Sequence, residues 1–506
     1  FLTFFILTIF RAFLITLYTF MVSSIVSNRK DKLFIFGHED SSPALLNDSF
    51  LRENSSYQVE GFLRFGPRIS MRIGIYKVYF VSDQAEFNRL VNRYNIKAIL
   101  FTDYKVVKEE SERLVRFCEK KKIRMLLLPS IDELQGGKIQ LRALPEVRIE
   151  DLLGREEIRI NMEEIAGSLK GKVVLVTGAA GSIGSELCRQ LCHFGLKQLV
   201  LFDSAETPMH NIRLELEEKF PDVEFTPVMG DIRMIHRVES IYQRFRPHIV
   251  FHAAAYKHVP LMEENPCEAV HTNVYGTRNV ADMAVKYDVD KFIMVSTDKA
   301  VNPTNVMGAT KRICEMIIQT FNKHFDTEFV AVRFGNVLGS NGSVIPLFKK
   351  QIMEGGPVTV THPDIIRYFM TIPEAVSLVL QAGAYAKGGE IFVLDMGKPV
   401  KILDLARNLI KLSGYRVGED IKIEFTGLRP GEKLYEELLM EEEGLKETDN
   451  KMIYIGKPIE LDETEFFVQL KKLKEESRDE SNDIRALVKE IVPTYHYADS
   501  SSAMQK

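Results

Sequence analysis

Three polar residues that could share an acid–base reaction stand together near the middle of the chain: Thr297, Asp298 and Lys299. They follow a short apolar run, residues 292–295, that is typical of a buried strand. In an open α/β sheet, ligands bind at the carboxyl ends of the strands. A hydroxyl, a carboxyl and an amine are therefore expected to reach one candidate site, although a structural ion pair in a loop would have the same sequence.

A second amine follows on a predicted helix. Lys311 comes after Met307 with the i,i+4 spacing that places two side chains on one helix face. We assign both to the catalytic site, and Lys311 also to the cofactor. A solvated helix lysine is the alternative for Lys311.

The segment 172–187 has the pattern of a dinucleotide-binding turn, in which an apolar run leads into three spaced glycines and then into a helix. The glycines permit the tight turn and the close approach of the backbone to a pyrophosphate, which the helix N-terminus attracts. The residues that we assign to the cofactor in this segment are Thr177, Gly178, Gly181, Ser182, Ile183 and Gly184.

Residues at the ends of the following strands extend the cofactor site. Asp203 ends the run 198–202, where a carboxylate can hold the ribose hydroxyls and would repel a 2′-phosphate, so NAD is favoured over NADP. Asp231, next to Ile232, is placed to accept from the adenine amino group, with a strand-end helix cap as the alternative. After the run 249–252, three small residues let the backbone approach the cofactor: Ala253, Ala254 and Ala255.

Polar residues after later strands are candidates for the substrate. Guanidinium groups bind diphosphates well, although any single arginine is more often a surface residue. We assign six residues to substrate binding: Lys257, Arg333, Asn336, Arg367, Arg429 and Glu432. Asn273 is expected in a helix behind the site and may equally be read as a buried structural amide.

Length and composition set the broad class. A chain of 506 residues is too long for one core, so we expect two or three domains. The net charge of −4 offers no basic field for a nucleic acid. The five cysteines include no Cys-x-x-Cys pair, so reduced core cysteines are favoured over disulfides, and no metal site is expected.

Residues 1–22 are almost wholly apolar and have the length of a membrane-spanning helix. Because the sequence begins with Phe1, we expect it to start inside a longer membrane region. A buried core helix is the alternative, and a signal peptide fits poorly. The cations at Arg29, Lys30 and Lys32 predict that the rest of the chain lies in the cytoplasm, on the inner face of the cell inner membrane.

The order of predicted strands and helices indicates an α/β fold. After the membrane helix we expect a small Rossmann-like domain at 33–135, which lacks a glycine-rich loop and is assigned to packing and assembly, and a connector at 136–170. A doubly wound parallel sheet follows at 171–440, with a smaller substrate-binding part from about 329. Residues 441–506 are predicted to be a charged tail with a helix at 463–476 and a disordered end at 499–506.

With these motifs, the chain resembles the extended short-chain dehydrogenase/reductase superfamily. Within it, the chain is similar to the membrane-bound polysaccharide-biosynthesis nucleotide-sugar 4,6-dehydratases, which act on UDP-N-acetylglucosamine. The resemblance covers residues 1 to about 440, and its most specific segments are 177–184, 252–260, 296–300 and 333–340.

The resemblance implies a mechanism. NAD oxidises the sugar at its 4-position, the 5-proton and the 6-hydroxyl are eliminated, and hydride returns to the 6-carbon. Lys299 would be the base, Asp298 the acid, and Thr297 would bind the 4-hydroxyl. An amine that acts as a base needs a lowered pKa, which we expect Lys311 and desolvation to provide.

One position departs from the superfamily pattern. The usual tyrosine base is replaced by Met307, whose thioether cannot take a proton, so Asp298 or water acting through Thr297 must do so. The implied partners are a UDP-sugar and the lipid bilayer, and we also expect a homo-oligomer. The alternatives are a nucleotide-sugar 4-epimerase and a non-catalytic membrane scaffold.

Overall fold

The structure, a computed structural model, describes residues 31–36, 57–66, 69–73, 75–101, 114, 117–118, 123–127, 158 and 160–497, with gaps at 341, 414, 438–443, 457 and 481. The predicted membrane helix at 1–22 lies outside these residues. No helix within the described ranges is both long and apolar enough to span a membrane. The described residues divide into two compact units, one before residue 157 that also includes 354–357 and 407–423, and one formed by the remainder.

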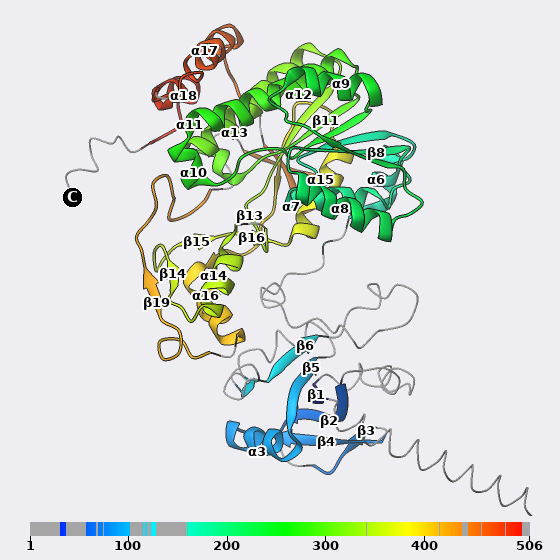
Figure 1. Cartoon of the computed structure of the whole chain (residues 1–506), viewed down its shortest axis with the longest axis vertical. Helices are drawn as coiled ribbons and strands as arrows, with labels where there is room; N and C mark the ends of the chain where they lie inside the picture. The colour runs from blue at the N-terminus through cyan, green and yellow to red at the C-terminus, as the bar shows by residue number, and fades with distance from the viewer. Residues whose placement is uncertain are drawn as a thin grey trace, which may run out of the picture. The chain divides into compact units, whose positions relative to one another are not determined.

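The first unit contains a six-stranded sheet in the order β3-β4-β2-β1-β5-β6, parallel except between β3 and β4 (Figure 1). Phenylalanine and aliphatic side chains such as Phe34, Ile35 and Leu100 are buried on the two faces of the sheet. Helix α3 begins after Asp83, whose carboxylate accepts from the backbone N–H of Glu86, and ends at Asn95. The elements are β1 Asp31–Phe36, β2 Tyr57–Phe65, β3 Arg72–Ile73, β4 Tyr76–Val81, α3 Gln84–Tyr94, β5 Ile96–Phe101 and β6 Arg124–Leu127.

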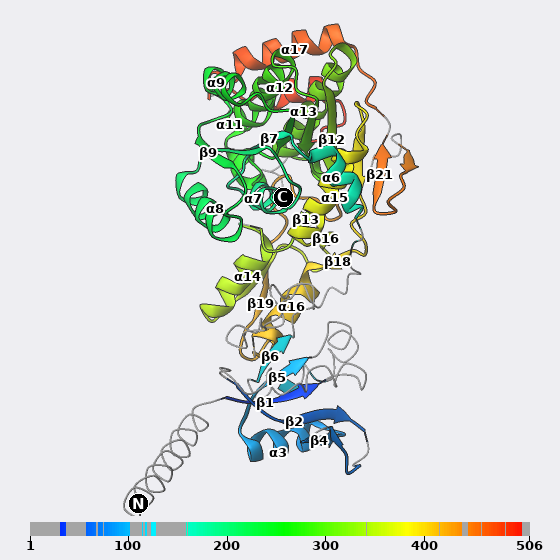
Figure 2. The ribbon, with the colours of Figure 1, turned by 90° about the vertical axis from the view of Figure 1, so that its right-hand side faces the viewer.

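The second unit contains a nine-stranded sheet in the order β20-β21-β17-β12-β11-β10-β7-β8-β9 (Figure 2). From β17 to β9 the strands are parallel, and β20 and β21 are antiparallel additions. The chain order reverses at β7, which is where open α/β sheets bind ligands. The strands are β7 Val173–Thr177, β8 Gln198–Asp203, β9 Phe225–Met229, β10 Ile249–His252, β11 Lys291–Val295, β12 Glu328–Arg333, β17 Ile391–Leu394, β20 Leu445–Glu447 and β21 Ile453–Gly456.

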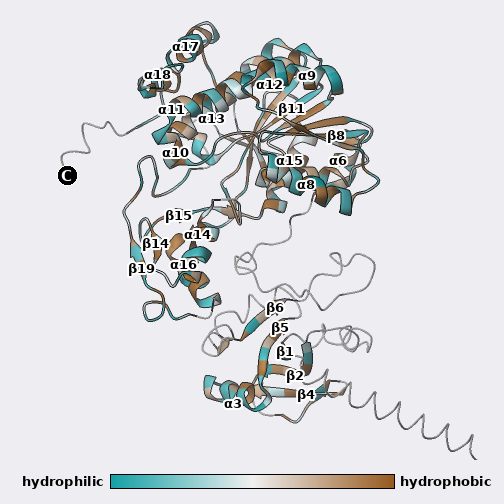
Figure 3. Cartoon of the chain, viewed as in Figure 1, coloured by the Kyte–Doolittle hydropathy of each residue, from teal (hydrophilic) through white to brown (hydrophobic). Residues whose placement is uncertain are grey.

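Helices cover both faces of this sheet, so its inner strands are buried and apolar on both sides (Figure 3). One face packs against α6 Met162–Leu169, α7 Ser182–Leu191, α8 Glu206–Lys219 and α15 Ile372–Tyr385. The opposite face packs against α9 Ile235–Phe245, α10 Val259–Glu264, α11 Pro266–Ala269, the π-helical segment η5 Val270–Gly276, α12 Thr277–Lys286 and α13 Val306–His324. This doubly wound arrangement confirms the predicted α/β fold with parallel sheets.

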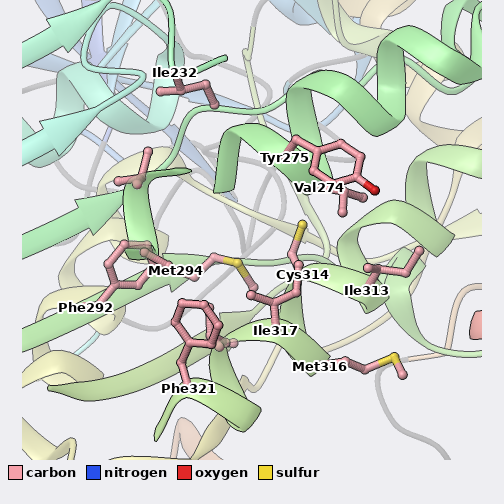
Figure 4. Close-up of a cluster of buried hydrophobic side chains, with 14 of the residues drawn as sticks. Ile232, Val274, Tyr275, Phe292, Met294, Ile313, Cys314, Met316, Ile317 and Phe321 are labelled. Atoms are coloured by element: carbon pink, nitrogen blue, oxygen red, sulfur yellow. The ribbon is translucent and has the colours of Figure 1, made fainter. Parts of the chain in front are cut away.

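Helix α13 is the central helix of the second face. Every residue from 306 to 321 is buried, and Ile317 and Phe321 belong to the same buried cluster as Phe292 and Met294 of β11 (Figure 4). The helix is thereby fixed against the strand that carries the candidate acid–base residues.

A smaller region is built from segments that follow β12. It contains β13 Asn336–Val337 paired with β16 Phe369–Met370, and β15 Ile366–Arg367 paired with β18 Val400–Lys401. The remaining elements are α14 Val344–Met353, β14 Val358–Val360, α16 Ile402–Leu412 and β19 Ile423–Phe425. Its first strand, β13, follows β12 in the chain, and between them the carbonyl oxygen of Phe334 accepts from the backbone N–H of Asp298, which follows β11. Residues 407–423, which include part of α16, belong to the first unit.

The segment predicted as a charged tail is instead folded between residues 444 and 497. Strands β20 and β21 extend the main sheet, and α17 Glu463–Glu476 confirms the predicted helix. Phe466, Leu470 and Leu473 are buried because they recur on one face of this otherwise charged helix. Helix α18 Arg485–Ile491 and Tyr495 complete the layer over α13. Residues 499–506 lie outside the described ranges.

Candidate active site

The glycine-rich turn after β7 brings two stretches of backbone into close contact. Gly178 has φ +69°, and a Cβ atom there would lie 2.7 Å from the backbone nitrogen of Ala254. A Cβ on Gly184 would lie 1.9 Å from the carbonyl oxygen of Gly178. Helix α7 begins after Gly181 without a side-chain cap, so its first N–H groups point out of the turn. The turn therefore fits a phosphate group at a helix N-terminus.

A cavity of about 210 Å³ lies beside this turn, at the point where the strand order reverses. The predicted cofactor residues that line it are Gly178, Gly181, Asp203, Asp231, Ile232, Ala253, Ala254 and Ala255. The sequence analysis did not single out six further lining residues: Phe202, Ser204, Gly230, Arg233, Tyr256 and Thr272. The cavity unites the ends of β7, β8, β9 and β10, as a dinucleotide site requires.

The two predicted acids of this cavity are held by local hydrogen bonds. The Asp203 carboxylate accepts from the backbone N–H groups of Ala180 and Ala205, both at 2.9 Å, which links β8 to the glycine turn. Asp231 accepts from Arg233 Nε at 2.9 Å and from its backbone N–H. Burial raises the pKa of Asp231, but the bonds from Arg233 outweigh it and the pKa is lowered. Asp231 is therefore held as a carboxylate, both of whose oxygens can only accept.

Five predicted cofactor residues do not line this cavity: Thr177, Ser182, Ile183, Gly184 and Lys311, which is described below. Ser182, Ile183 and Gly184 form the first turn of α7, and the Thr177 hydroxyl is fully buried 2.7 Å from Nδ1 of His252. His252 is bonded through its other ring nitrogen to Thr277 at 2.8 Å, and burial lowers the pKa of His252 to about 3. The Thr177 side chain thus joins β7 to His252 of β10 and, through it, to Thr277 of α12, and its contact with the cofactor stays a prediction.

The candidate acid–base residues lie at the carboxyl end of β11, two strands from β7. Thr297 caps a short 3₁₀ turn, η6 Asp298–Ala300, and its hydroxyl lies 2.8 Å from Asp298 Oδ1. Lys299 Nζ donates to the same Oδ1 at 3.0 Å and to Asn336 Oδ1 at 3.3 Å. The Asp298 side chain is 0% exposed and that of Lys299 is 17% exposed. The hydroxyl, the carboxyl and the amine thus form one connected cluster.

Glycine at two positions lets other segments approach this cluster. Asp298 Oδ2 is buried without a hydrogen-bond partner, and a Cβ on Gly335 would lie 3.1 Å from it. A Cβ on Gly308 in α13 would lie 2.1 Å from the carbonyl oxygen of Lys299. The turn that carries Asp298 and Lys299, the candidate catalytic turn, is therefore enclosed by the residues after β12 and by α13.

The direction of the Lys299 pKa shift corrects our prediction. Burial acts to lower this pKa, but the carboxylates of Asp298 and Glu436 outweigh burial and raise it. Lys311, which we expected to lower it, instead donates from Nζ to the carbonyl oxygen of Val295 at 2.7 Å, and burial lowers the pKa of Lys311 itself. Met307 is buried in the first turn of α13. The resting Lys299 is thus an ammonium.

Two of the predicted substrate arginines are committed elsewhere. Arg333 is fully buried and forms a bidentate pair with Glu315 of α13, with both bonds at 2.7 Å. Arg367 donates to the carbonyl oxygens of Leu434 and Lys433 and clamps the loop 429–437. Both guanidinium groups are buried and bonded to other parts of the protein, so neither is presented to a diphosphate.

The remaining substrate candidates lie nearer the surface. Arg429 is exposed, and its backbone N–H donates to Glu432. Lys257 is exposed after β10, and burial of part of its side chain lowers its pKa. Asn336 contacts Lys299 as described above. Asn273, in η5, binds the backbone of Tyr256 with both ends of its amide, which supports the structural interpretation of this residue.

The C-terminal layer supports the start of α13. The Glu263 carboxylate accepts from the backbone N–H of Val306 at 2.6 Å and pairs with Arg485 of α18 at 3.4 Å. The backbone N–H of His496 donates to the carbonyl oxygen of Pro303. The helix that encloses the catalytic turn is therefore anchored by α18 and the residues after it.

Comparison with known proteins places this site in a family. A family model described as "Polysaccharide biosynthesis protein" matches residues 174–458, which is more than half of the chain. The chain belongs to this family. It is 52% identical over 370 residues to the "Capsular polysaccharide biosynthesis protein CapD" of Staphylococcus aureus, and the match covers 73% of this chain and 62% of that relative. The chain thus spans less than two thirds of CapD.

Two further comparisons cover most of shorter proteins. The "UDP-glucose 4-epimerase" of Rickettsia canadensis is 36% identical over 288 residues, which are 55% of this chain and 80% of that protein. The solved structure of Pen from Bacillus thuringiensis is 38% identical with a TM-score of 0.54, and the match covers 57% of this chain and 89% of Pen.

In this member of the polysaccharide biosynthesis protein family, one edge of the sheet carries both the cavity beside the glycine turn and the hydroxyl–carboxyl–amine cluster. Glu436, which our sequence analysis missed, completes the cluster from the loop 429–437, with Oε1 3.7 Å from Lys299 Nζ. The five residues before it include the predicted Glu432, but spacing alone does not tell which acid of this charged loop points inward. The arrangement can move protons at a ligand held beside a bound dinucleotide.

Proposed function

We propose that this protein is an NAD-dependent nucleotide-sugar 4,6-dehydratase that acts on UDP-N-acetylglucosamine in the biosynthesis of a surface polysaccharide. The observation that carries the proposal is the Asp298–Lys299 pair at the carboxyl end of β11, on the same sheet edge as the nucleotide cavity. An elimination needs one group that takes a proton and one that gives a proton, and this pair can do both.

The residues of the cavity fit NAD. The turn at Gly178 and the N-terminus of α7 would hold the diphosphate, Asp203 the ribose hydroxyls, and Asp231 the adenine. A carboxylate at Asp203 disfavours the 2′-phosphate of NADP. When bound, NAD supplies the reversible oxidation of the sugar 4-position that makes the 5-proton acidic.

Thr297 and Asp298 would handle the proton of the 4-hydroxyl. Because Asp298 is 0% exposed, the sugar can reach it only through a neighbour, and the Thr297 hydroxyl lies 2.8 Å from Oδ1. The 4-hydroxyl proton passes through Thr297 to the Asp298 carboxylate. Asp298 then returns this proton through the Thr297 hydroxyl to the departing 6-hydroxyl, which leaves as water. This relay takes the place of the tyrosine base whose position Met307 occupies.

Lys299 would handle the 5-proton. The free amine takes the proton from the 5-carbon during elimination and gives it back to the same carbon once the 6-position has been reduced. The proton count is then balanced, because the water carries away the proton of the 4-hydroxyl. The resting ammonium of Lys299 must first lose its own proton to solvent, so we expect turnover to rise with pH through the pKa of Lys299.

Incubation with UDP-N-acetylglucosamine and NAD tests the proposal, with the product read by mass spectrometry and NMR. We expect the loss of one water and a 4-keto-6-deoxy sugar. Asp298→Asn and Lys299→Ala should each lower turnover by more than about 10²-fold. The control is Asp290→Asn, at the other end of β11, where the side chain forms only an exposed pair with Lys172. Full turnover in either site variant would refute the assignment.

A nucleotide-sugar 4-epimerase is the second candidate, because the Rickettsia relative of that name is 36% identical over 288 residues, which are 80% of its length. An epimerase returns hydride to the 4-carbon and needs no acid–base pair for water loss. A product of unchanged mass with inverted configuration would favour the epimerase over the dehydratase, and no product would favour a scaffold.

We also propose that residues 1–22 hold the chain at the cytoplasmic face of the inner membrane. The support is the apolar run followed by Arg29, Lys30 and Lys32. Fractionation of cells that express the full chain and a form beginning at residue 31 tests this, since only the full chain should sediment with membranes. The predicted homo-oligomer stays a prediction.

A further inference from the structure

The loop 429–437 lies directly against the catalytic turn. The carbonyl oxygen of Gly431 accepts from Thr304 Oγ1 at 3.0 Å and from Asn305 Nδ2 at 3.1 Å. Lys433 Nζ donates to the carbonyl oxygen of Val301 at 3.2 Å. The loop is thus attached to the residues between Lys299 and α13 by its backbone and Lys433, and also by Glu437, which accepts from Asn302 Nδ2 at 3.1 Å. None of these bonds involves Glu436.

One acid of this loop points inward. The Glu436 side chain is 5% exposed, and its Oε1 lies 3.7 Å from Lys299 Nζ and 3.7 Å from Arg367 Nε. Three charged groups therefore influence the Lys299 amine: Asp298 on its own turn, Glu436 on the loop and Arg367 on β15. The first two favour the ammonium, and Arg367 opposes it.

The position of Glu436 separates a charge effect from a fold effect. Arg367 already holds the loop through the carbonyl oxygens of Lys433 and Leu434, at 2.8 and 3.3 Å. Glu432 on the same loop also pairs with Arg367, at 3.4 Å, and has no bond to Lys299 among the described contacts. A buried carboxylate is costly unless it is paired, and for Glu436 the paired charges are the Lys299 amine and the Arg367 guanidinium.

We propose that Glu436 is a further positioning residue of this site, which holds Lys299 in its protonated resting form and shares its carboxylate with Arg367. This inference rests on the proposed function, in which Lys299 must become a free amine before each turnover. Glu436 thereby sets the pH at which the site becomes competent, and Arg367 limits how strongly it does so.

The consequence is opposite to that expected for an ordinary active-site acid. Glu436→Gln removes one of the two negative charges that favour the ammonium, while the side chain keeps its shape. An opposite charge at this distance shifts a pKa by about 1–3 units. Because Asp298 and Arg367 remain, we expect the lower part of this range, so the free amine forms at a pH about 1–2 units lower. On the acidic limb of the wild-type pH profile, turnover of Glu436→Gln should therefore exceed that of the wild type about tenfold or more.

The test measures the Lys299 amine directly in the full chain. Acetic anhydride labels only the free amine, and its rate at Lys299 relative to exposed lysines is followed by peptide mass spectrometry from pH 6 to 11. The midpoint is compared among wild type, Glu436→Gln, Glu436→Asp and the control Glu432→Gln. The pH dependence of dehydration is measured on the same proteins, with thermal unfolding as a check of folding.

The proposal is supported if the labelling midpoint is about 1–2 pH units lower in Glu436→Gln than in the wild type and is unchanged in Glu432→Gln. An unchanged midpoint in Glu436→Gln, or an equal shift in Glu432→Gln, overturns it. If Glu436→Gln does not fold, Glu436→Asp decides in the same way, because its shorter side chain withdraws the charge from Lys299. The labelling result holds even if the protein yields no dehydrated sugar, so failure of this inference and failure of the proposed function are distinguishable.

Discussion

Gly308→Ala is the substitution whose effect the structure predicts most directly. Gly308 lies in the first turn of α13, where its N–H donates to the N-cap Asn305 at 2.8 Å. An added Cβ would lie 2.1 Å from the carbonyl oxygen of Lys299, whereas ordinary contact begins at 3.4 Å. The helix and the catalytic turn must therefore separate by about 1.3 Å. Because α13 is buried from 306 to 321, we expect the turn to move, and Asp298 and Lys299 with it.

A displacement of about 1 Å at reacting groups can lower the rate about 10²-fold. We therefore expect a loss of about 10²-fold in dehydration at saturating sugar, with a destabilisation of about 1–3 kcal/mol. Calorimetry should show unchanged NAD affinity, because the turn at Gly178 is untouched. The control is Gly167→Ala in α6, where a Cβ meets nothing within 4 Å and should add about 0.5–1 kcal/mol of stability. Turnover of Gly308→Ala within twofold of the wild type would refute the reasoning.

Two further predictions concern buried polar groups. Glu315→Gln should lower the free energy of unfolding in urea by about 3–5 kcal/mol, because Arg333 loses its buried anionic partner. The control Glu217→Gln, in an exposed pair with Arg213, should cost under about 1 kcal/mol, and equal losses would contradict this prediction. Burial, and then Lys311, lower the pKa of His252 to about 3. Because the unfolded state takes up the proton first, the folded state should lose stability as the pH falls from about 6.5 to 3, with a slope approaching about 1.4 kcal/mol per pH unit. His252→Gln should flatten that slope in urea titrations from pH 7 to 4, and an unchanged slope would show that other groups carry it.

Features set by neighbours in the sequence were predictable. The glycine turn, the acid at the end of β8 and the Thr297–Asp298–Lys299 run each follow an apolar strand, and the pattern places all of them at one sheet edge. The same is true of the helix at 463–476, where the caps and charges define both ends.

Features set by contacts between distant segments were not predictable. Arg333 was assigned to the substrate because it ends a strand. Nothing in the sequence links it to its partner in the fold, Glu315 on α13. Lys299 was assigned a lowered pKa because Lys311 is near in sequence. The carboxylates of Asp298 and then Glu436 instead raise this pKa, and Glu436 comes from a loop far along the chain. The folded residues 444–497 were read as a tail because three buried positions are outnumbered by charges.

The anchoring of α13 by Glu263 and Arg485 bears on how the protein is made. A ribosome synthesises the whole nucleotide-binding half well before Arg485 and His496 leave it. The first turn of α13 then gains these supports only after residues 485 and 496 have been synthesised. A product that stops shortly before Arg485 would therefore keep the residues of its cofactor cavity but lack the contacts that hold the start of α13, next to Lys299.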